Sequence, residues 1–182
     1  MSTTSSNPTN RDWLRKLVSG RPHQVIPNRD GGPYLRRWYL IPRNPFFNVY
    51  LHHFLSSDDD RALHDHPWWF VSLILRGSYI EVSESAEGKM TALIRTSVTD
   101  IRSAFWRRWI AFRPATYRHR VVLATTSDER GEMPCWTLIV TGRRSRTWGF
   151  WCKQRTPFLQ RRVGDRFVPW DEFGDGGCGE AA

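Results

Sequence analysis

The residues LHDHPWWFVSLILRG (63–77) carry the most informative pattern in the chain. Two histidines, His64 and His66, stand two residues apart, just before the apolar run 70–75 and a turn at Arg76-Gly77. On an extended chain, residues i and i+2 point to the same face, so both imidazoles can reach one point on the inner wall of a sheet. The pair therefore predicts part of a metal site, with a solvated or hydrogen-bonded histidine pair as the alternative.

The remainder of the chain reads as short strands separated by turns. We expect strands at residues 34–41, 46–55, 70–75, 78–83, 91–96, 121–124, 135–141 and 147–152. Such regular spacing, with almost no helical periodicity after residue 30, predicts an all-β fold: a single small antiparallel β-barrel or jelly roll. Small barrels of this kind enclose a pocket wide enough for one ligand or ion.

The chain divides into three segments by composition. Residues 1–30 are expected to be a flexible N-terminal segment, with a short helix at 11–19, and residues 31–173 to form the β-barrel. Residues 174–182 are glycine-rich and are expected to be a disordered tail. The length of 182 residues suits one domain, and the ten Trp, ten Phe and five Tyr require a packed core.

The charge balance is basic, with a formal net charge of +9. Much of the excess lies between Arg143 and Arg166, where Asp165 is the single acid. A solvated basic face is the favoured interpretation, and contact with nucleic acid through this segment is the alternative.

The cysteines and hydropathy predict a soluble cytoplasmic protein. Cys135, Cys152 and Cys178 are odd in number, far apart and without a CxxC motif, so we expect no disulfide and a reducing compartment. No apolar run approaches the ~20 residues of a membrane span, and the start of the chain lacks the apolar core of a signal peptide.

A third histidine completes the pattern. His119 lies five residues after Pro114, about fifty residues beyond the pair, and begins its own apolar run. Together the three histidines resemble the two metal motifs of the cupin superfamily, H-x-H closed by a glycine and P-x-G-x-x-H. Gly77 closes the first motif here, and Thr116 replaces the glycine of the second. Phe70 and Val71 occupy the place of that family's glutamate, so the resemblance implies a site of three histidines.

The set of three histidines without a glutamate resembles the metal site of the thiol dioxygenases, of which cysteine dioxygenase is the best known. His119-Arg120-Val121 resembles that family's H-R-V, and Tyr34-x-Arg36 resembles its Tyr-x-Arg, whose arginine holds the substrate carboxylate. The resemblance covers about residues 34–141. It implies His64, His66 and His119 as metal ligands, and Arg36 and Tyr34 as catalytic residues.

Two departures from that family leave the substrate open. The Ser-x-His-x-Tyr motif falls on TLIVT (137–141), and residues 67–71 lack the cysteine that crosslinks to its tyrosine in animal enzymes. The expected function is an Fe(II)-dependent oxygenase acting with O2 on a small carboxylate- or thiol-bearing substrate; Zn, Ni or Mn suits the same ligands. The alternative is a non-catalytic cupin that binds a metal or small ligand. Pairing of two copies through edge strands is also open.

Strand alternation sets expectations for the neighbouring residues. Only one of Arg36 and Arg37, and at most one of His52 and His53, can face the interior. Asp65 points away from the histidines and is expected to cap its loop. Two further sets are expected at the surface: Trp68 and Trp69 at the mouth of the barrel, and the stretch 105–109 (FWRRW) on an exposed edge.

Overall fold

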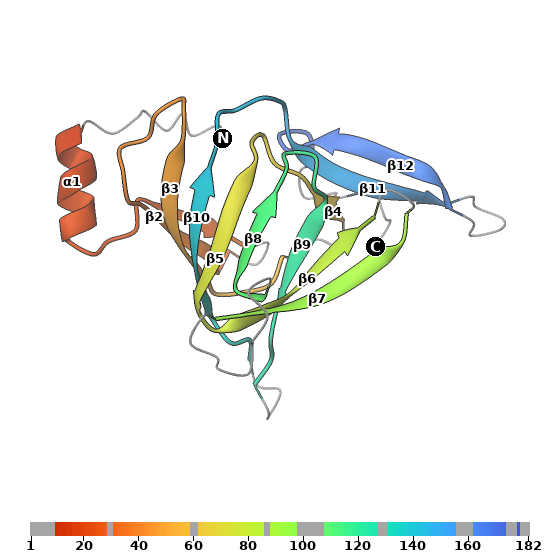
Figure 1. Cartoon of the computed structure of the whole chain (residues 1–182), viewed down its shortest axis with the longest axis horizontal. Helices are drawn as coiled ribbons and strands as arrows, with labels where there is room; N and C mark the ends of the chain where they lie inside the picture. Colours follow the sequence, from red (N-terminus) through yellow and green to blue (C-terminus); the bar gives the residue numbers. More distant parts are fainter. Residues whose placement is uncertain are drawn as a thin grey trace.

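Two antiparallel sheets packed face to face make up the computed structural model (Figure 1). The structure describes residues 10–28, 31–58, 62–85, 88–97, 108–126, 131–155, 162–173 and 178. The first sheet has the strand order β1 (Gln24–Pro27), β2 (Pro33–Tyr39), β3 (Asn48–Phe54), β10 (Cys135–Thr141), β5 (Phe70–Arg76), β8 (Ile110–Arg113). The second has the order β12 (Arg162–Pro169), β11 (Gly149–Arg155), β4 (Leu63–His64), β9 (His119–Leu123), β6 (Ser78–Glu84), β7 (Met90–Thr96).

The central eight strands, β3 to β10, form a jelly roll. The first of them pairs with the last, β3 with β10, and the inner strands follow the same rule: β4 with β9, β5 with β8, β6 with β7. The predicted all-β antiparallel fold is confirmed. The two sheets are not closed into a barrel, because each ends in an edge strand (β1 and β8, β12 and β7).

Two hairpin extensions widen the sandwich beyond the expected strands. The pair β1–β2 extends the first sheet next to β3, and the pair β11–β12 extends the second sheet next to β4. The strands β1, β4, β8 and β12 were not expected from the sequence. Three of them have two to four residues, too few for an apolar alternation to be recognised.

The core lies between the two sheets and follows the strand period. Burial alternates residue by residue along β3, β5, β6 and β9. Side chains of both sheets meet in one cluster: Leu35, Phe54, Ile74, Tyr79, Val121, Leu123 and Cys135. Gly77 makes the turn between β5 and β6 with φ of 85°, and a Cβ there would lie 2.7 Å from the carbonyl oxygen of Pro134. Glycine is therefore required at the turn that links the two sheets.

The short N-terminal helix is present as α1 (Asn10–Val18). It is attached through Trp13, whose indole Nε1 donates to the carbonyl oxygen of Tyr39 at 2.7 Å. The strand β1 also lies within the segment expected to be flexible, and it forms an antiparallel pair with β2. Paired structure therefore begins before residue 31. Most of the expected tail, 174–182, lies outside the described residues, as do Met1 to Thr9 and most of the stretch 105–109.

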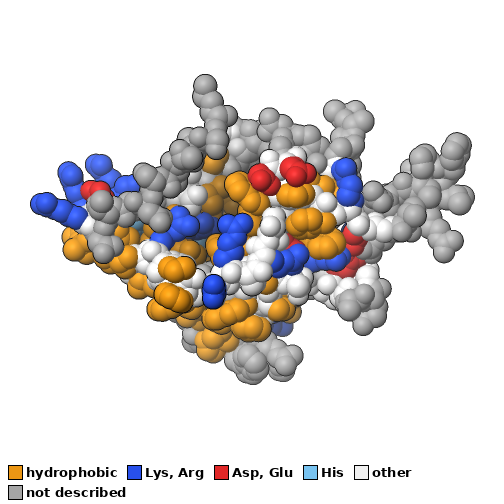
Figure 2. Space-filling model, turned by 90° about the horizontal axis from the view of Figure 1, so that it is seen from above, with side chains coloured by type: hydrophobic (Ala, Val, Ile, Leu, Met, Phe, Trp, Pro, Cys, Tyr) orange, Lys and Arg blue, Asp and Glu red, His pale blue; other side chains and the backbone are white. Residues whose placement is uncertain are grey.

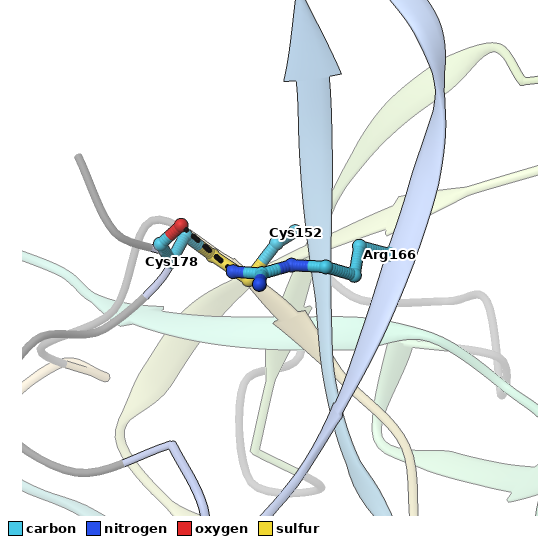
Figure 3. Close-up of a disulfide and its surroundings, with 3 residues drawn as sticks. All are labelled: Cys152, Arg166 and Cys178. Carbon is cyan, nitrogen blue, oxygen red and sulfur yellow. Dashed lines mark hydrogen bonds between the residues drawn. A yellow bond between two sulfur atoms is a disulfide. The ribbon is translucent and has the colours of Figure 1, made fainter.

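The expectation of no disulfide is wrong. Cys152 on β11 is bonded to Cys178, 26 residues further along the chain (Figure 3). Arg166 on β12 donates from Nη2 to the carbonyl oxygen of Cys178 at 3.2 Å. The bond belongs to a small apolar cluster of Ala62, Cys152 and Phe173. Sequence spacing could not reveal it, because the approach of the two cysteines depends on the tertiary structure and not on a local pattern. Cys135 is buried and free.

Three of the five basic side chains described in the segment 143–166 have partners within the fold, and four of the five are exposed. Arg146 pairs with Asp65, Lys153 lies 3.8 Å from Glu84, and Arg166 donates to Cys178. Figure 2 shows Lys and Arg side chains on one face dispersed among hydrophobic and acidic ones. Among the described residues, no helix is long and apolar enough to cross a membrane.

Candidate metal centre

Three histidines converge on the inner face of the second sheet. The register pairs His64 of β4 directly with His119 of β9, and His66 follows β4 by two residues. The ring centroids lie 4.9 Å (His64–His119), 5.1 Å (His66–His119) and 5.1 Å (His64–His66) apart. One nitrogen of each ring lies within 4.8 Å of the others. The fold thus brings together the three residues singled out from the sequence.

The nitrogen separation fits a shared metal ion. The Nε2 atoms of His66 and His119 are 2.9 Å apart. Two nitrogens bound to one metal at right angles, with bonds of about 2.1 Å, lie about 3.0 Å apart. At that separation the two rings can share a single proton or a single cation. The third nitrogen, from His64, completes a triangular donor face.

A buried carboxylate stands behind His119. Glu81 of β6 is 1% exposed, and its Oε1 accepts from His119 Nδ1 at 3.1 Å. Burial opposes ionisation of Glu81, but hydrogen bonds from His119 and Arg113 outweigh it and hold the pKa of this carboxyl below its usual value. Arg95, fully buried, lies 3.3 Å from the other oxygen. With Nδ1–H donated to Glu81, the Nε2 atom of His119 faces the centre as an acceptor.

A second carboxylate stands behind His64. The Nδ1 atom of His64 lies 3.7 Å from Oδ2 of Asp58. Asp58 is itself fastened to β9, because the same oxygen accepts from the backbone N–H of Val121 at 2.6 Å, and Tyr34 donates its hydroxyl to the other oxygen. One of the three rings, His119, is therefore oriented by a carboxylate hydrogen bond on its far side, as is common at protein metal sites, and a second, His64, has a carboxylate 3.7 Å away.

Burial keeps two of the rings neutral. Loss of solvent lowers the pKa of His64 to about 4, with Asp58 opposing the shift and His119 adding to it. The pKa of His66 is well below its usual value, again chiefly through burial, with the neighbouring His64 and His119 contributing. A neutral imidazole is the form that binds a metal, so no proton has to be displaced near neutral pH.

The centre opens into a cavity of about 690 Å³ between the sheets. All three histidines line it. Its other walls are largely aromatic: Tyr34, Tyr39, Tyr50, Phe54, Phe70, Trp68, Tyr79, Trp148, Phe150 and Trp170. A cavity of this size, mostly apolar with a few convergent polar groups, is typical of a small-molecule site.

The structure corrects the assignment of Arg36. Its side chain is exposed, on the opposite face of β2 from the cavity. The inward position belongs to Arg37, which lines the cavity and donates from Nε to Nε2 of His52 at 2.8 Å. His53 faces outward and stacks on Trp136 at 4.0 Å. As expected from strand alternation, one member of each pair faces in. Tyr34 lines the cavity with its hydroxyl held by Asp58.

The loop that carries His66 is held by Asp65. This side chain is fully buried and accepts from the backbone N–H of Gly149 and from Nε1 of Trp151, each at 3.0 Å. Arg146 lies 2.8 Å away and neutralises it. The expectation was that Asp65 caps its own loop, but its side-chain partners belong to β11 and the segment before it. Trp68 lines the cavity, whereas Trp69 is 41% exposed and packs on Phe112.

Sequence reasoning missed Glu81, Asp58 and the inward Arg37. For Glu81 a weak signal exists, since it is a charged residue at the centre of an otherwise strand-like run, SYIEVS (78–83). For Asp58 no local signal exists, because a run of three consecutive acids (58–60) is typical of a solvated turn. The choice between Arg36 and Arg37 needed the register of β2 on β3, in which Arg37 lies opposite His52.

Comparison with known proteins adds little beyond architecture. No protein-family model matches the chain, and no curated protein is similar to it in sequence. One similar solved structure is an uncharacterized conserved protein with a double-stranded β-helix domain from Klebsiella pneumoniae subsp. pneumoniae, 12% identical with a TM-score of 0.44, over 69% of this chain and 89% of that one.

Two enzymes are similar at the same level. The hydroxypropylphosphonic acid epoxidase from S. wedmorenis is 15% identical, with a TM-score of 0.44 over 65% of this chain and 54% of that one. A recombinant oxalate oxidase in complex with glycolate is 9% identical, with a TM-score of 0.43 over 69% and 59%. Likeness this low assigns no family or activity to the chain, and the fold class rests on the strand order given above.

Proposed function

We propose that this protein is a metal-dependent oxygenase, with Fe(II) held by His64, His66 and His119. The observation that supports the proposal is the convergence of three imidazoles, two of them with a carboxylate nearby, on one wall of a cavity between the sheets. Three neutral ligands leave the charge of the ion intact and up to three coordination positions free for other ligands. A structural zinc site would instead close its fourth position.

The residues of the chain have separate tasks in this proposal. Bound Fe(II) would supply positions at which O2 and a substrate donor atom react side by side. Glu81 and Asp58 hold the rings of His119 and His64 in the orientation that ligation requires. The aromatic walls exclude water from the reacting groups. Arg37, rather than Arg36, is the cation available inside the cavity to a substrate carboxylate.

The ligand assignment is tested by metal content. The protein is purified anaerobically under conditions that leave the disulfide intact, loaded with Fe(II), and compared with His119→Ala and His66→Ala by elemental analysis. We expect about one iron per chain in the parent and a loss of at least tenfold in affinity in both variants. The matched control is His52→Ala, another buried histidine that lines the same cavity, which should keep its iron. Equal iron in all four proteins contradicts the assignment.

The oxygenase activity is tested separately. O2 uptake by the iron-loaded protein is followed with a panel of small thiols and carboxylates, with His119→Ala as the blank. Uptake that depends on both iron and one substrate class supports the proposal. Retention of metal with no uptake on any substrate supports instead the alternative, a non-catalytic metal- or ligand-binding protein. Parallel loading with Zn, Ni and Mn decides which ion the ligands prefer.

A further inference from the structure

The wall of the cavity that faces the histidines carries a cation without an acidic partner. Arg37 lies on β2 of the first sheet, whereas the three histidines belong to the second sheet and its loop. Loss of solvent lowers the pKa of this guanidinium, and the neighbouring Arg43 lowers it further. An arginine remains charged even so. A partly buried charge that lines a cavity normally has an anion beside it.

The hydrogen bonds of Arg37 leave donors free to bind such an anion. Its Nε donates to His52, and Nη1 donates to Oε1 of Gln24 at 3.1 Å. These two bonds use two of the five N–H groups of a guanidinium. Among the described residues, no carboxylate lies within ion-pair distance of Arg37. The free edge of the fork suits a carboxylate or phosphate oxygen pair.

A second guanidinium stands at the rim of the same cavity. Arg43 is exposed and lines the cavity, and its Cζ atom lies 5.5 Å from the centroid of the Tyr39 ring. The Cζ atom of Arg37 lies 5.2 Å from the centroid of the Tyr50 ring. The ring centroids of Tyr39 and Tyr50 are 5.5 Å apart. Two like charges are thus held around one pair of aromatic rings. An anion placed between them relieves their mutual repulsion, and a dianion relieves it more than a monoanion does.

The cavity lined by this basic pair and the histidines is large, and most of its lining is apolar. The cavity volume of about 690 Å³ lies well inside the ~300–1,000 Å³ range of sites for drug-sized ligands. Its lining includes Phe54, Phe70, Tyr79 and Val121, which offer surface to an apolar body. A substrate the size of a small amino acid would leave most of this volume empty.

We propose that Arg37 and Arg43 form an anion subsite, and that the cavity takes an elongated apolar or aromatic molecule with a terminal oxyanion, best a phosphate-like dianion. The head group lies on the basic pair, and the body extends along the aromatic walls toward His64, His66 and His119. The identification of this molecule as a substrate depends on the proposed function. Its binding does not, because no subsite residue belongs to the histidine cluster.

Isothermal titration of the full chain tests the subsite with three probes that share one aromatic body: 1-naphthyl phosphate, 1-naphthylacetate and 1-naphthylacetamide. We expect both anions to bind, the phosphate more tightly, and the neutral amide to bind at least tenfold more weakly, as charge-assisted hydrogen bonds require. Equal binding of amide and anions, or binding of none of the three, overturns the proposal.

Matched variants locate the binding on this wall. Arg37→Gln should weaken 1-naphthyl phosphate by about 10- to 100-fold and leave the amide unchanged. Its neighbour on the outer face of the same strand provides the control, since Arg36→Gln should change affinity by less than about twofold. If Arg37→Gln does not fold, Arg43→Gln at the rim should still weaken the phosphate by about threefold or more. An equal loss in Arg36→Gln overturns the proposal.

The two proposals fail in different ways. Anion discrimination that is lost in Arg37→Gln but kept in His119→Ala supports the subsite whether or not the protein holds iron. Iron binding and O2 uptake without any preference for anionic probes leaves the proposed function standing and overturns the subsite.

Discussion

Glu81 shows how one buried side chain can serve the fold and the site together. It forms ion pairs with both Arg95 and Arg113 and also accepts from His119. The buried guanidinium of Arg95 has its other hydrogen bonds to the carbonyl oxygen of Arg108 and to Ser72. A carboxylate in this position therefore links the charge balance of the interior to the orientation of a candidate ligand.

The variant Glu81→Gln removes the charge and keeps the shape. We expect the affinity for Fe(II) to fall by about 10- to 100-fold, because His119 loses its carboxylate partner. The melting temperature should also fall, because Arg95 stays buried without a counter-charge. Metal titration and thermal unfolding measure the two effects. Asp165→Asn, which removes the partner of the more exposed Arg118, is the control and should leave metal affinity unchanged. Unaltered iron affinity in Glu81→Gln would leave this residue a purely structural role.

The buried histidines predict how stability depends on pH. In the metal-free protein His64 binds a proton only near pH 4, whereas the unfolded chain binds it near 6.5. The unfolded state therefore holds more protons between these values, and the free energy of unfolding falls as pH is lowered from 6.5 to 4. His64 alone accounts for up to about 3 kcal/mol, and His52 and His66 act in the same direction.

Urea unfolding with a chelator present, at several pH values through this window, measures the effect. His64→Gln should flatten the profile. The carboxyl of Glu81 has a lowered pKa, so its own contribution is lost only below its ordinary value of 4.5. Stability that stays level from pH 6.5 to 5 contradicts the prediction.

At the scale of elements, the candidate site depends on a strand of two residues. β4 lies between β9 and β11, and its single pairing with β9 places His64 opposite His119. A strand of two residues has few backbone hydrogen bonds of its own. Hydrogen bonds from Gly149 and Trp151 of β11 to the carboxylate of Asp65 hold the end of β4 in place. The hairpin β11–β12 is therefore part of what positions the histidines, although it lies outside the central jelly roll.

The disulfide anchors that hairpin to the C-terminal region. Closing a loop of 26 residues predicts a stabilisation of about 3 kcal/mol through restriction of the unfolded chain. Cys178→Ser should accordingly lower the melting temperature by about 6–12 °C. A thiol reductant should lower the melting temperature of the parent and leave that of Cys178→Ser unchanged. A variant as stable as the parent would show that the bond contributes nothing to folding.

For the whole molecule, the sheet order predicts where the fold is most resistant to opening. β10 lies between β3 and β5, and β9 lies between β4 and β6, so both are hydrogen-bonded on two sides. β12 has one partner strand, and α1 is fastened to the sheet through Trp13 and its neighbours. Hydrogen exchange followed by mass spectrometry should find amide exchange slowest in peptides of β9 and β10 and fastest in α1. Equal protection of α1 and β10 would contradict this order.

The sequence by itself determined the strand character of the molecule and the identity of its clustered histidines. Alternating apolar residues and glycine turns are local properties, so β10 was predicted with its bounds and β2, β3, β5 and β6 within a few residues of theirs. The i, i+2 spacing of His64 and His66, with His119 before an apolar run, likewise needs only the geometry of an extended chain.

Only the tertiary structure decided what surrounds those histidines. Glu81, Asp58 and Arg37 reach the site through strand pairing and register, which join residues far apart in the chain. Shifting β2 by one residue would exchange Arg37 for Arg36 at the cavity wall. The amino-acid composition does not predict which of these two registers forms. The bond from Cys152 to Cys178 has the same origin, since it depends on the approach of segments that share no local pattern.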